Sequence, residues 1–235
     1  MGDCLMPLAT RPSSLSEPDR VEFVLSNFEQ ALKDHGLDVV WSKATLCPNR
    51  DPTQPGHERL SCALCDENGW VYFDPQPIRV LAMSHALRQM FMPESRYEPG
   101  TAYVTAQAEH KLSFFDKLEL TESKARFYQV VPVEGVTYRL KYKVLEIVHI
   151  IKNDGTTIEP KAVLVNADGS ITFGDTPDAE FLSISYTHRP VYIVQDILHY
   201  IRDRRQTEAG SDVLREFPNQ AMVKLDFLVR DESAD

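Results

Sequence analysis

The sequence predicts a mainly β protein with a few helices (α+β), in which a Greek-key or barrel-like β domain follows an N-terminal helix and a cysteine-containing loop and hairpin. Segments rich in β-branched and aromatic residues recur at short spacing from Gly100 onward. Glycine and proline, 10 and 15 of the 235 residues, interrupt the chain often enough to favour short strands over long helices. An apolar content of 43% is sufficient for a buried core.

The N-terminal part is predicted to form an arm followed by a helix. Residues 1–15 mix proline, serine, threonine and leucine without periodicity, and we expect them to be a mobile arm. Ser16 and Asp19 resemble a capping box, and apolar residues then fall on one helical face from Glu17 to His35. Gly36 is suited to end this helix in a left-handed conformation, which glycine adopts without a steric penalty.

A first strand and a cysteine-containing hairpin come next. Asp38–Leu46 is rich in residues that favour a half-buried strand, so the segment 16–46 is predicted to hold the helix and this strand. Residues 47–75 form the predicted cysteine loop and hairpin. This segment begins with a proline-rich loop, turns at Asp66–Gly69 and ends in the strand Trp70–Phe73.

Residues 76–235 are predicted to form the barrel-like domain, with hairpin insertions and a C-terminal strand. Asn153–Gly155 and Ala167–Gly169 supply residues that tight hairpin turns require. The segments 78–92 and 190–204 fit either a helix or a strand, and both alternatives stay open. The predicted strands are Thr101–Ala106, Lys117–Thr121, Ala125–Val133, Tyr138–Lys152, Ala162–Asn166, Ser170–Phe173, Phe181–Tyr186 and Ala221–Val229.

Composition and charge exclude several classes of protein. A formal net charge of -10 disfavours a tight, non-specific grip on nucleic acid, which depends on lysine and arginine neutralising phosphates. Every apolar run is shorter than the ~20 residues of a membrane helix, so no membrane span is expected. Met1–Arg11 lacks the pattern of a secretory signal, and we therefore expect synthesis in the cytoplasm, where cysteines stay reduced.

Cys47, His57, Cys62 and Cys65 are the candidate metal ligands. The C-x-x-C pair offers two thiolates from one tight turn, as tetrahedral zinc sites do. Cys47 and His57 would have to fold back to complete a Cys3His set around a structural zinc ion. Two interpretations stay open: a zinc site, or reduced thiols in a hydrogen-bonded loop.

No catalytic residues are predicted, and the chain is not expected to be an enzyme. A triad can be assembled on paper from Ser84, His85 and Asp74, but no G-x-S-x-G elbow presents a serine nucleophile. No H-E-x-x-H motif and no glycine-rich phosphate loop occurs in the sequence. No cofactor-binding residues are predicted beyond the candidate metal ligands.

The order of features from residue 37 to about 145 resembles a family of neck proteins of tailed bacteriophages, the head-closure or adaptor components of the head-tail connector; these features lie in 36–52, 62–75, 97–123 and 139–147. A G-x-A-x-V-T strand at Gly100–Thr105 and a D-[RK]-[IL]-x-[LV] strand at Asp116–Leu120 carry the resemblance, which covers somewhat under half the chain. Asn49 stands where the family pattern often has a second cysteine. Either His57 replaces that ligand, or the loop holds without metal.

The resemblance implies a structural virion protein, synthesised in the host and located in the phage neck. The subunits would form a hexameric or dodecameric ring that joins the head to the tail and helps to retain or pass packaged DNA. Its partners would be a portal or adaptor protein on the head side and a tail terminator or tail tube protein on the tail side. DNA would pass the lumen of such an adaptor or stopper without sequence-specific binding.

The alternative is that the chain is a small zinc-ribbon-containing module with a nucleic-acid-binding or regulatory function. Such a module requires a basic face beside the cysteine loop. Arg50 and Arg59 lie in that loop, but acidic residues accompany them, namely Asp51, Glu58, Asp66 and Glu67. The charge pattern therefore favours the structural virion protein.

Overall fold

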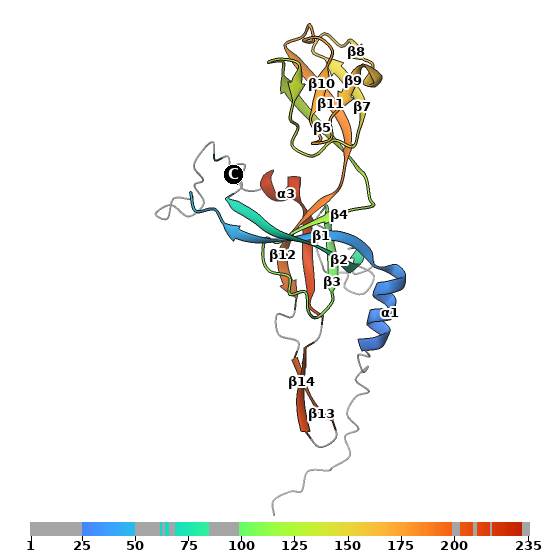
Figure 1. The fold of residues 1–235 in the computed structure, drawn as a ribbon, viewed down its shortest axis with the longest axis vertical. Helices are drawn as coiled ribbons and strands as arrows, with labels where there is room; N and C mark the ends of the chain where they lie inside the picture. The colour runs from blue at the N-terminus through green and yellow to red at the C-terminus, as the bar shows by residue number, and fades with distance from the viewer. Residues whose placement is uncertain are drawn as a thin grey trace, which may run out of the picture.

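The computed structural model describes residues 25–49, 62, 64–65, 69–84, 99–198, 203–208, 211–216 and 218–231. The predicted N-terminal arm, 1–15, lies outside these residues. Within them, the protein is mainly β with an N-terminal helix (Figure 1), which confirms the predicted fold class.

Helix α1 spans Leu25–His35, the second half of the predicted helix; its predicted first half lies outside the described residues. Leu32 is its buried anchor, and the Gly36 N–H donates to the Leu32 carbonyl oxygen at 2.9 Å. The prediction that Gly36 is left-handed is wrong, since its φ is not among the positive glycine angles. Glycine is required there for space, because a Cβ would clash with the Leu32 carbonyl and the Arg79 side chain.

Six antiparallel strands close into a barrel in the order β1-β2-β3-β15-β12-β4. Mostly β-branched and aliphatic side chains fill its interior, among them Val39, Val80, Leu118, Val194 and Val223, each at most 1% exposed. Closure leaves this sheet without an unpaired edge. The strands are β1 (Leu37–Leu46), β2 (Trp70–Ser84), β3 (Thr101–Ala106), β4 (Lys117–Leu120), β12 (Val191–Leu198) and β15 (Gln220–Leu225).

The carboxylate of Asp116, 1% exposed, lies where three segments of the barrel meet. Trp41 Nε1 and the Ser113 N–H donate to Oδ2, each at 2.8 Å, and the Ala44 N–H donates to Oδ1 at 3.0 Å. Burial raises the pKa of Asp116, and the three donors oppose this rise by favouring the carboxylate. The residue before it, Phe115, has a φ of 66° and stacks on Trp70 with ring centroids 4.1 Å apart.

Residues between β4 and β12 form a second β unit, which stands beyond the barrel along the long axis of the molecule (Figure 1). One sheet has the order β5-β11-β7-β8 and the other β6-β10-β9. Side chains from both sheets share a core separate from that of the barrel, centred on Ile150, Ile171, Leu182 and Ile184. The strands are β5 (Ala125–Pro132), β6 (Thr137–Tyr138), β7 (Glu146–Lys152), β8 (Thr157–Ile158), β9 (Val163–Val165), β10 (Ile171–Phe173) and β11 (Phe181–His188), with the short 3-10 helix η1 (Pro160–Ala162) before β9.

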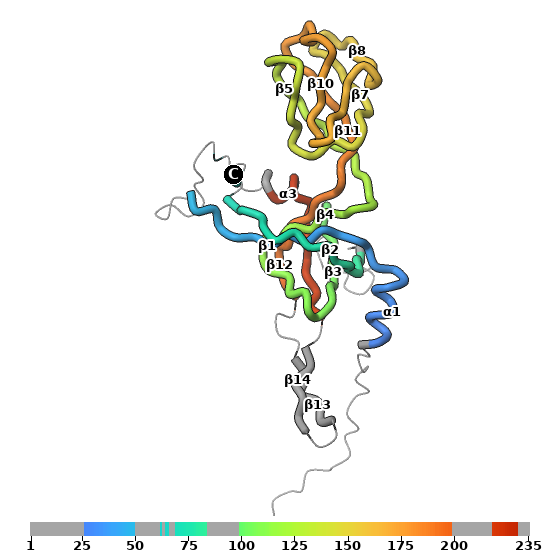
Figure 2. Tube along the Cα trace, in the orientation of Figure 1, coloured from blue at the N-terminus to red at the C-terminus, as the bar shows by residue number. Residues whose placement is uncertain are grey.

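The chain enters this second unit after β4 and returns into β12, as the tube in Figure 2 shows. A short helix, α3 (Asp226–Asp231), follows β15 and contacts the second unit. Tyr142 Oη donates to Asp226 Oδ2 at 2.8 Å, and the rings of Phe127 and Phe227 lie 5.6 Å apart. These contacts join the two units beside the chain connections.

Two predicted strands are wrong in extent. The predicted strand Tyr138–Lys152 is divided, because its middle residues hydrogen-bond elsewhere: the Lys141 N–H donates to Gln129 Oε1 and the Leu145 N–H to the Thr187 carbonyl. The predicted strand Ala221–Val229 ends at Leu225, whose N–H donates to the Gly100 carbonyl, and α3 follows. Asp226 then lies in the first turn of α3, where an acidic side chain stabilises a helix.

The structure also decides parts of the ambiguous segments. Ile78 to Ser84 belongs to β2, so residue 76, the predicted start of the barrel-like domain, lies inside that strand. Val191–Leu198 is the strand β12, and residues 203–208 pair with 211–216 as the hairpin β13-β14. In the part of the chain that the structure describes, no helix is long and apolar enough to cross a membrane.

We predict that Asp116→Asn destabilises the protein by about 1–3 kcal/mol, because the amide places an N–H group against a buried donor. Urea unfolding of the variant should show a lower midpoint with an unchanged slope. Asp175→Asn, at an exposed loop position, is the matched control and should leave the midpoint unchanged. Equal midpoints for the wild type and Asp116→Asn would contradict the importance of this carboxylate.

Candidate metal centre

Cys47 is placed by the pairing of β1 with β2. The two strands pair as far as Leu46 and Trp70, and the Cys47 N–H then donates to the Gly69 carbonyl at 2.8 Å. Gly69 has a φ of 70°, which allows the chain to turn into β2 beside Cys47. The barrel ladder therefore fixes the position of the first cysteine.

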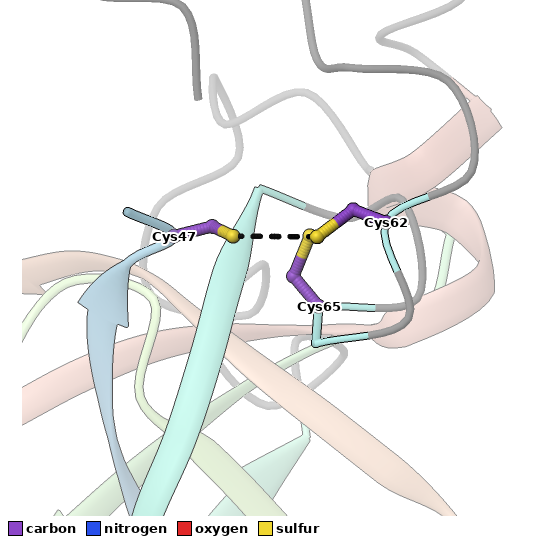
Figure 3. Close-up of side chains that lie close together, drawn as sticks. All are labelled: Cys47, Cys62 and Cys65. Atoms are coloured by element: carbon purple, nitrogen blue, oxygen red, sulfur yellow. Dashed lines mark hydrogen bonds between the residues drawn. The ribbon is translucent and has the colours of Figure 1, made fainter. Parts of the chain in front are cut away.

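Cys62 and Cys65 come from the connection between β1 and β2 and face Cys47 (Figure 3). The three Sγ atoms lie within 4.8 Å of one another, and those of Cys47 and Cys62 are 3.7 Å apart. A disulfide has its sulfurs at about 2.05 Å, so these are separate thiols. Cys47 and Cys65 are buried, whereas Cys62 is half-buried.

The spacing of the sulfurs fits a metal ion. Tetrahedral ligation with Zn–S bonds of about 2.3 Å places neighbouring sulfurs about 3.8 Å apart. The distance of 3.7 Å between the Cys47 and Cys62 sulfurs is close to this value. All three sulfurs lie within 4.8 Å of one another, so they would have to move only slightly closer to bind one ion. The three cysteines can therefore hold a metal ion, with one tetrahedral position left for a further ligand.

The cysteines differ in how easily they lose a proton. Hydrogen bonds, first from the Asn49 side chain and then from the backbone N–H groups of Leu64 and Cys65, lower the pKa of Cys62 to about 6. Burial raises the pKa of Cys47. Cys47 thus keeps its proton longer and is the donor in its hydrogen bond to the Cys62 sulfur. Metal binding requires thiolates, and Cys62 is already deprotonated near neutral pH.

Of the four predicted ligands, the structure brings Cys47, Cys62 and Cys65 together, and His57 lies outside the described residues. Asn49, noted in the sequence only as a missing cysteine, donates from Nδ2 to Cys62 Sγ at 3.4 Å. The position of Asn49, two residues after Cys47, is the sequence feature from which a place beside the cysteines could have been predicted. The catalytic triad considered from the sequence, Ser84, His85 and Asp74, is not assembled in the described residues. Asp74 forms an ion pair with Lys43 at 2.8 Å, and His85 lies outside the described residues.

No protein-family model matches the chain, and no curated protein sequence matches it. The resemblance to phage neck proteins therefore stays a prediction that depends on the residues quoted for it. The fold and the cysteine cluster stand on the structure.

We predict that the purified, reduced protein contains about one zinc ion per chain and that Cys65→Ser removes most of it. A serine hydroxyl does not supply the thiolate that the ion requires. Atomic emission on the dialysed protein measures the zinc content. Val136→Ser, at an exposed position of the second β unit, is the control and should keep the ion; equal loss in both variants would contradict the assignment.

We predict that, in metal-free protein, alkylation of Cys62 by iodoacetamide rises with pH around a midpoint of about 6. Asn49→Ala should raise that midpoint, since it removes the largest contribution to the low pKa of Cys62, whereas Asn153→Ala should not. Peptide mass spectrometry across a pH series measures the rate at Cys62. A midpoint at the ordinary thiol value of about 8.5 would contradict the prediction.

The same pKa fixes the sign of the pH dependence of stability. The pKa of Cys62 is lower in the folded chain than the ordinary thiol value, so the folded state binds fewer protons between the two values. The thiolate therefore contributes stability that is fully present above the unfolded pKa. That contribution is lost as pH falls through about 6.

Proposed function

We propose that the chain is a structural virion protein that assembles into a ring in the neck of a tailed phage, between the head and the tail. The ring would join a portal or adaptor protein to a tail terminator or tail tube protein and help to retain or pass packaged DNA. One structural observation carries the proposal: an exposed apolar face on the second β unit, which indicates a protein partner.

This face consists of Tyr128 and Val130 on β5, Ile151 on β7 and Phe181 on β11. Val130 and Ile151 both pair with Ser183, and residues paired across a ladder point to the same side of a sheet. Tyr128 and Phe181 lie two residues along their strands and so share that side. The four side chains are 64%, 65%, 37% and 43% exposed, respectively.

Such a face favours a protein contact. Single exposed apolar residues are ordinary on protein surfaces, but a contiguous patch is found where a partner binds. Aromatic residues are enriched at interface cores, and Ser183, exposed between Val130 and Ile151, leaves room for a partner side chain. The opposite side of the same sheet is already occupied by the core around Leu182 and Ile184.

The arrangement of the two units suits a ring. Head-to-tail rings form when one surface of a subunit binds a different surface of the next. The apolar face is on the second unit, and the closed barrel presents no free strand edge, so the complementary surface would be built from side chains. The sequence resemblance supplies the identity of the ring, and the apolar face supports assembly.

Within this function, we assign the metal of the cysteine cluster as a structural zinc ion, with His57 as its proposed fourth ligand. Closed sites with four protein ligands hold loops that are too small to have a core of their own. The ion would tie the loop between β1 and β2 to the barrel. Such a site has no open coordination position for catalysis.

We predict that light scattering of the purified protein across a concentration series shows a mass of a hexamer or dodecamer, either alone or after addition of a portal or tail preparation. Imaging of the same sample should show rings. A protein that stays monomeric, binds neither the portal nor the tail preparation and binds nucleic acid would contradict the neck function and favour the zinc-ribbon module.

The double variant Tyr128→Ser, Val130→Ser should weaken assembly about tenfold or more, because interface energy concentrates in a few apolar side chains. Both side chains point away from the core, so circular dichroism should remain that of the wild type. Val136→Ser, at a 39% exposed position outside this face, is the control and should assemble normally. Equal assembly of all three proteins would show that the face is not the interface.

A further inference from the structure

A cavity of about 160 Å³ lies where the barrel meets the second β unit. Three separate parts of the chain line it: β4, the segment between β6 and β7, and the turn from β11 into β12. The charged and titratable groups at its wall are Lys117, Glu119, Lys141, Tyr142, Lys143, His188 and Arg189.

Positive charge is concentrated around this cavity. Four cationic side chains line it with one carboxylate, although the whole chain has a formal net charge of -10. Arg189 Nη1 lies 3.7 Å from Glu119 Oε1, so that single carboxylate is already engaged. A cleft lined mainly by charges of one sign concentrates ions of the opposite sign, here anions, from solution.

The wall is held in place by aromatic and backbone contacts. The imidazole of His188, 2% exposed, stacks on the ring of Tyr142 with centroids 4.3 Å apart. His188 Nδ1 lies 2.7 Å from the Arg189 carbonyl oxygen, which can only accept, so Nδ1 carries the proton. The hydrogen bond from Tyr142 to Asp226 fixes the other ring of the stack.

The two lysines of the segment between β6 and β7 are also positioned. Lys141 Nζ lies 5.7 Å from the ring centroids of both Phe127 and Tyr142, within cation–π range. Lys143 packs against Gly169, which has a φ of 84° and where a Cβ would meet the Lys143 backbone at 2.9 Å. Glycine at 169 therefore allows Lys143 its place at the cavity.

We propose that this cavity binds a phosphate group, either free inorganic phosphate or a phosphomonoester. Several cations around one hollow match a dianion better than a monovalent carboxylate, and lysine and arginine are the usual phosphate ligands. The cavity is lined by both units of a single chain. The site therefore does not require ring assembly. An experiment can thus reject phosphate binding without rejecting the neck function, and the reverse.

Calorimetric titration of the full-length protein with inorganic phosphate, against chloride at matched ionic strength, tests the proposal. Phosphate should bind with a resolved heat and raise the melting temperature, and chloride should do neither. Lys143→Gln should weaken phosphate binding about tenfold, because it removes one charged contact at the cavity. Lys161→Gln removes the same charge at an exposed position of η1 and should bind as the wild type.

Two further probes distinguish the sources of phosphate. A nucleoside monophosphate that binds more tightly than inorganic phosphate would identify a phosphomonoester ligand, and equal or weaker binding would identify free phosphate. A single-stranded oligonucleotide with no terminal phosphate supplies only phosphodiesters and should not compete. The proposal is overturned if phosphate behaves as chloride does, if Lys143→Gln and Lys161→Gln lose binding equally, or if only the oligonucleotide binds.

Discussion

The buried carboxylate of Asp116 is the interaction on which the barrel depends. A carboxylate in the interior is stable only when hydrogen bonds replace its water, and here donors come from β1 and from the loop before β4. The backbone of residues 115 and 116 binds β12. The Phe115 N–H donates to the Val194 carbonyl, and the Val194 N–H donates to the Asp116 carbonyl. The side chain of Asp116 thus binds β1 and the loop before β4, and the backbone at the same position binds β12.

The cysteine cluster and the second β unit both follow from this barrel. β1 runs from the donors of Asp116 directly to Cys47, so the register of β1 with β2 places that sulfur opposite the C-x-x-C turn. At β4 and β12 the chain leaves for the second unit and returns. The barrel therefore serves as the frame, with three cysteines that can hold a metal ion on one hairpin and an exposed apolar face on the inserted unit.

Much of the fold was predictable because local pattern and tertiary environment agree. β3 was predicted with its observed bounds, since Thr101–Ala106 has strand residues and begins after a glycine. Prediction failed where backbone groups find partners far along the chain. The backbone N–H groups of Lys141 and Leu145 donate to Gln129 and Thr187, respectively. These partners lie outside 138–152, so the residue pattern of that segment could not predict them.

The sequence by itself determined that the chain is mainly β and that Cys62 and Cys65 share a turn, because strand propensity and a C-x-x-C spacing act over a few residues. Only the tertiary structure decided that Cys47 joins them, that residues between β4 and β12 have a core of their own, and that Lys143, His188 and Arg189 line one cavity. These arrangements depend on strand register and on barrel closure, which bring together residues that are distant in the sequence.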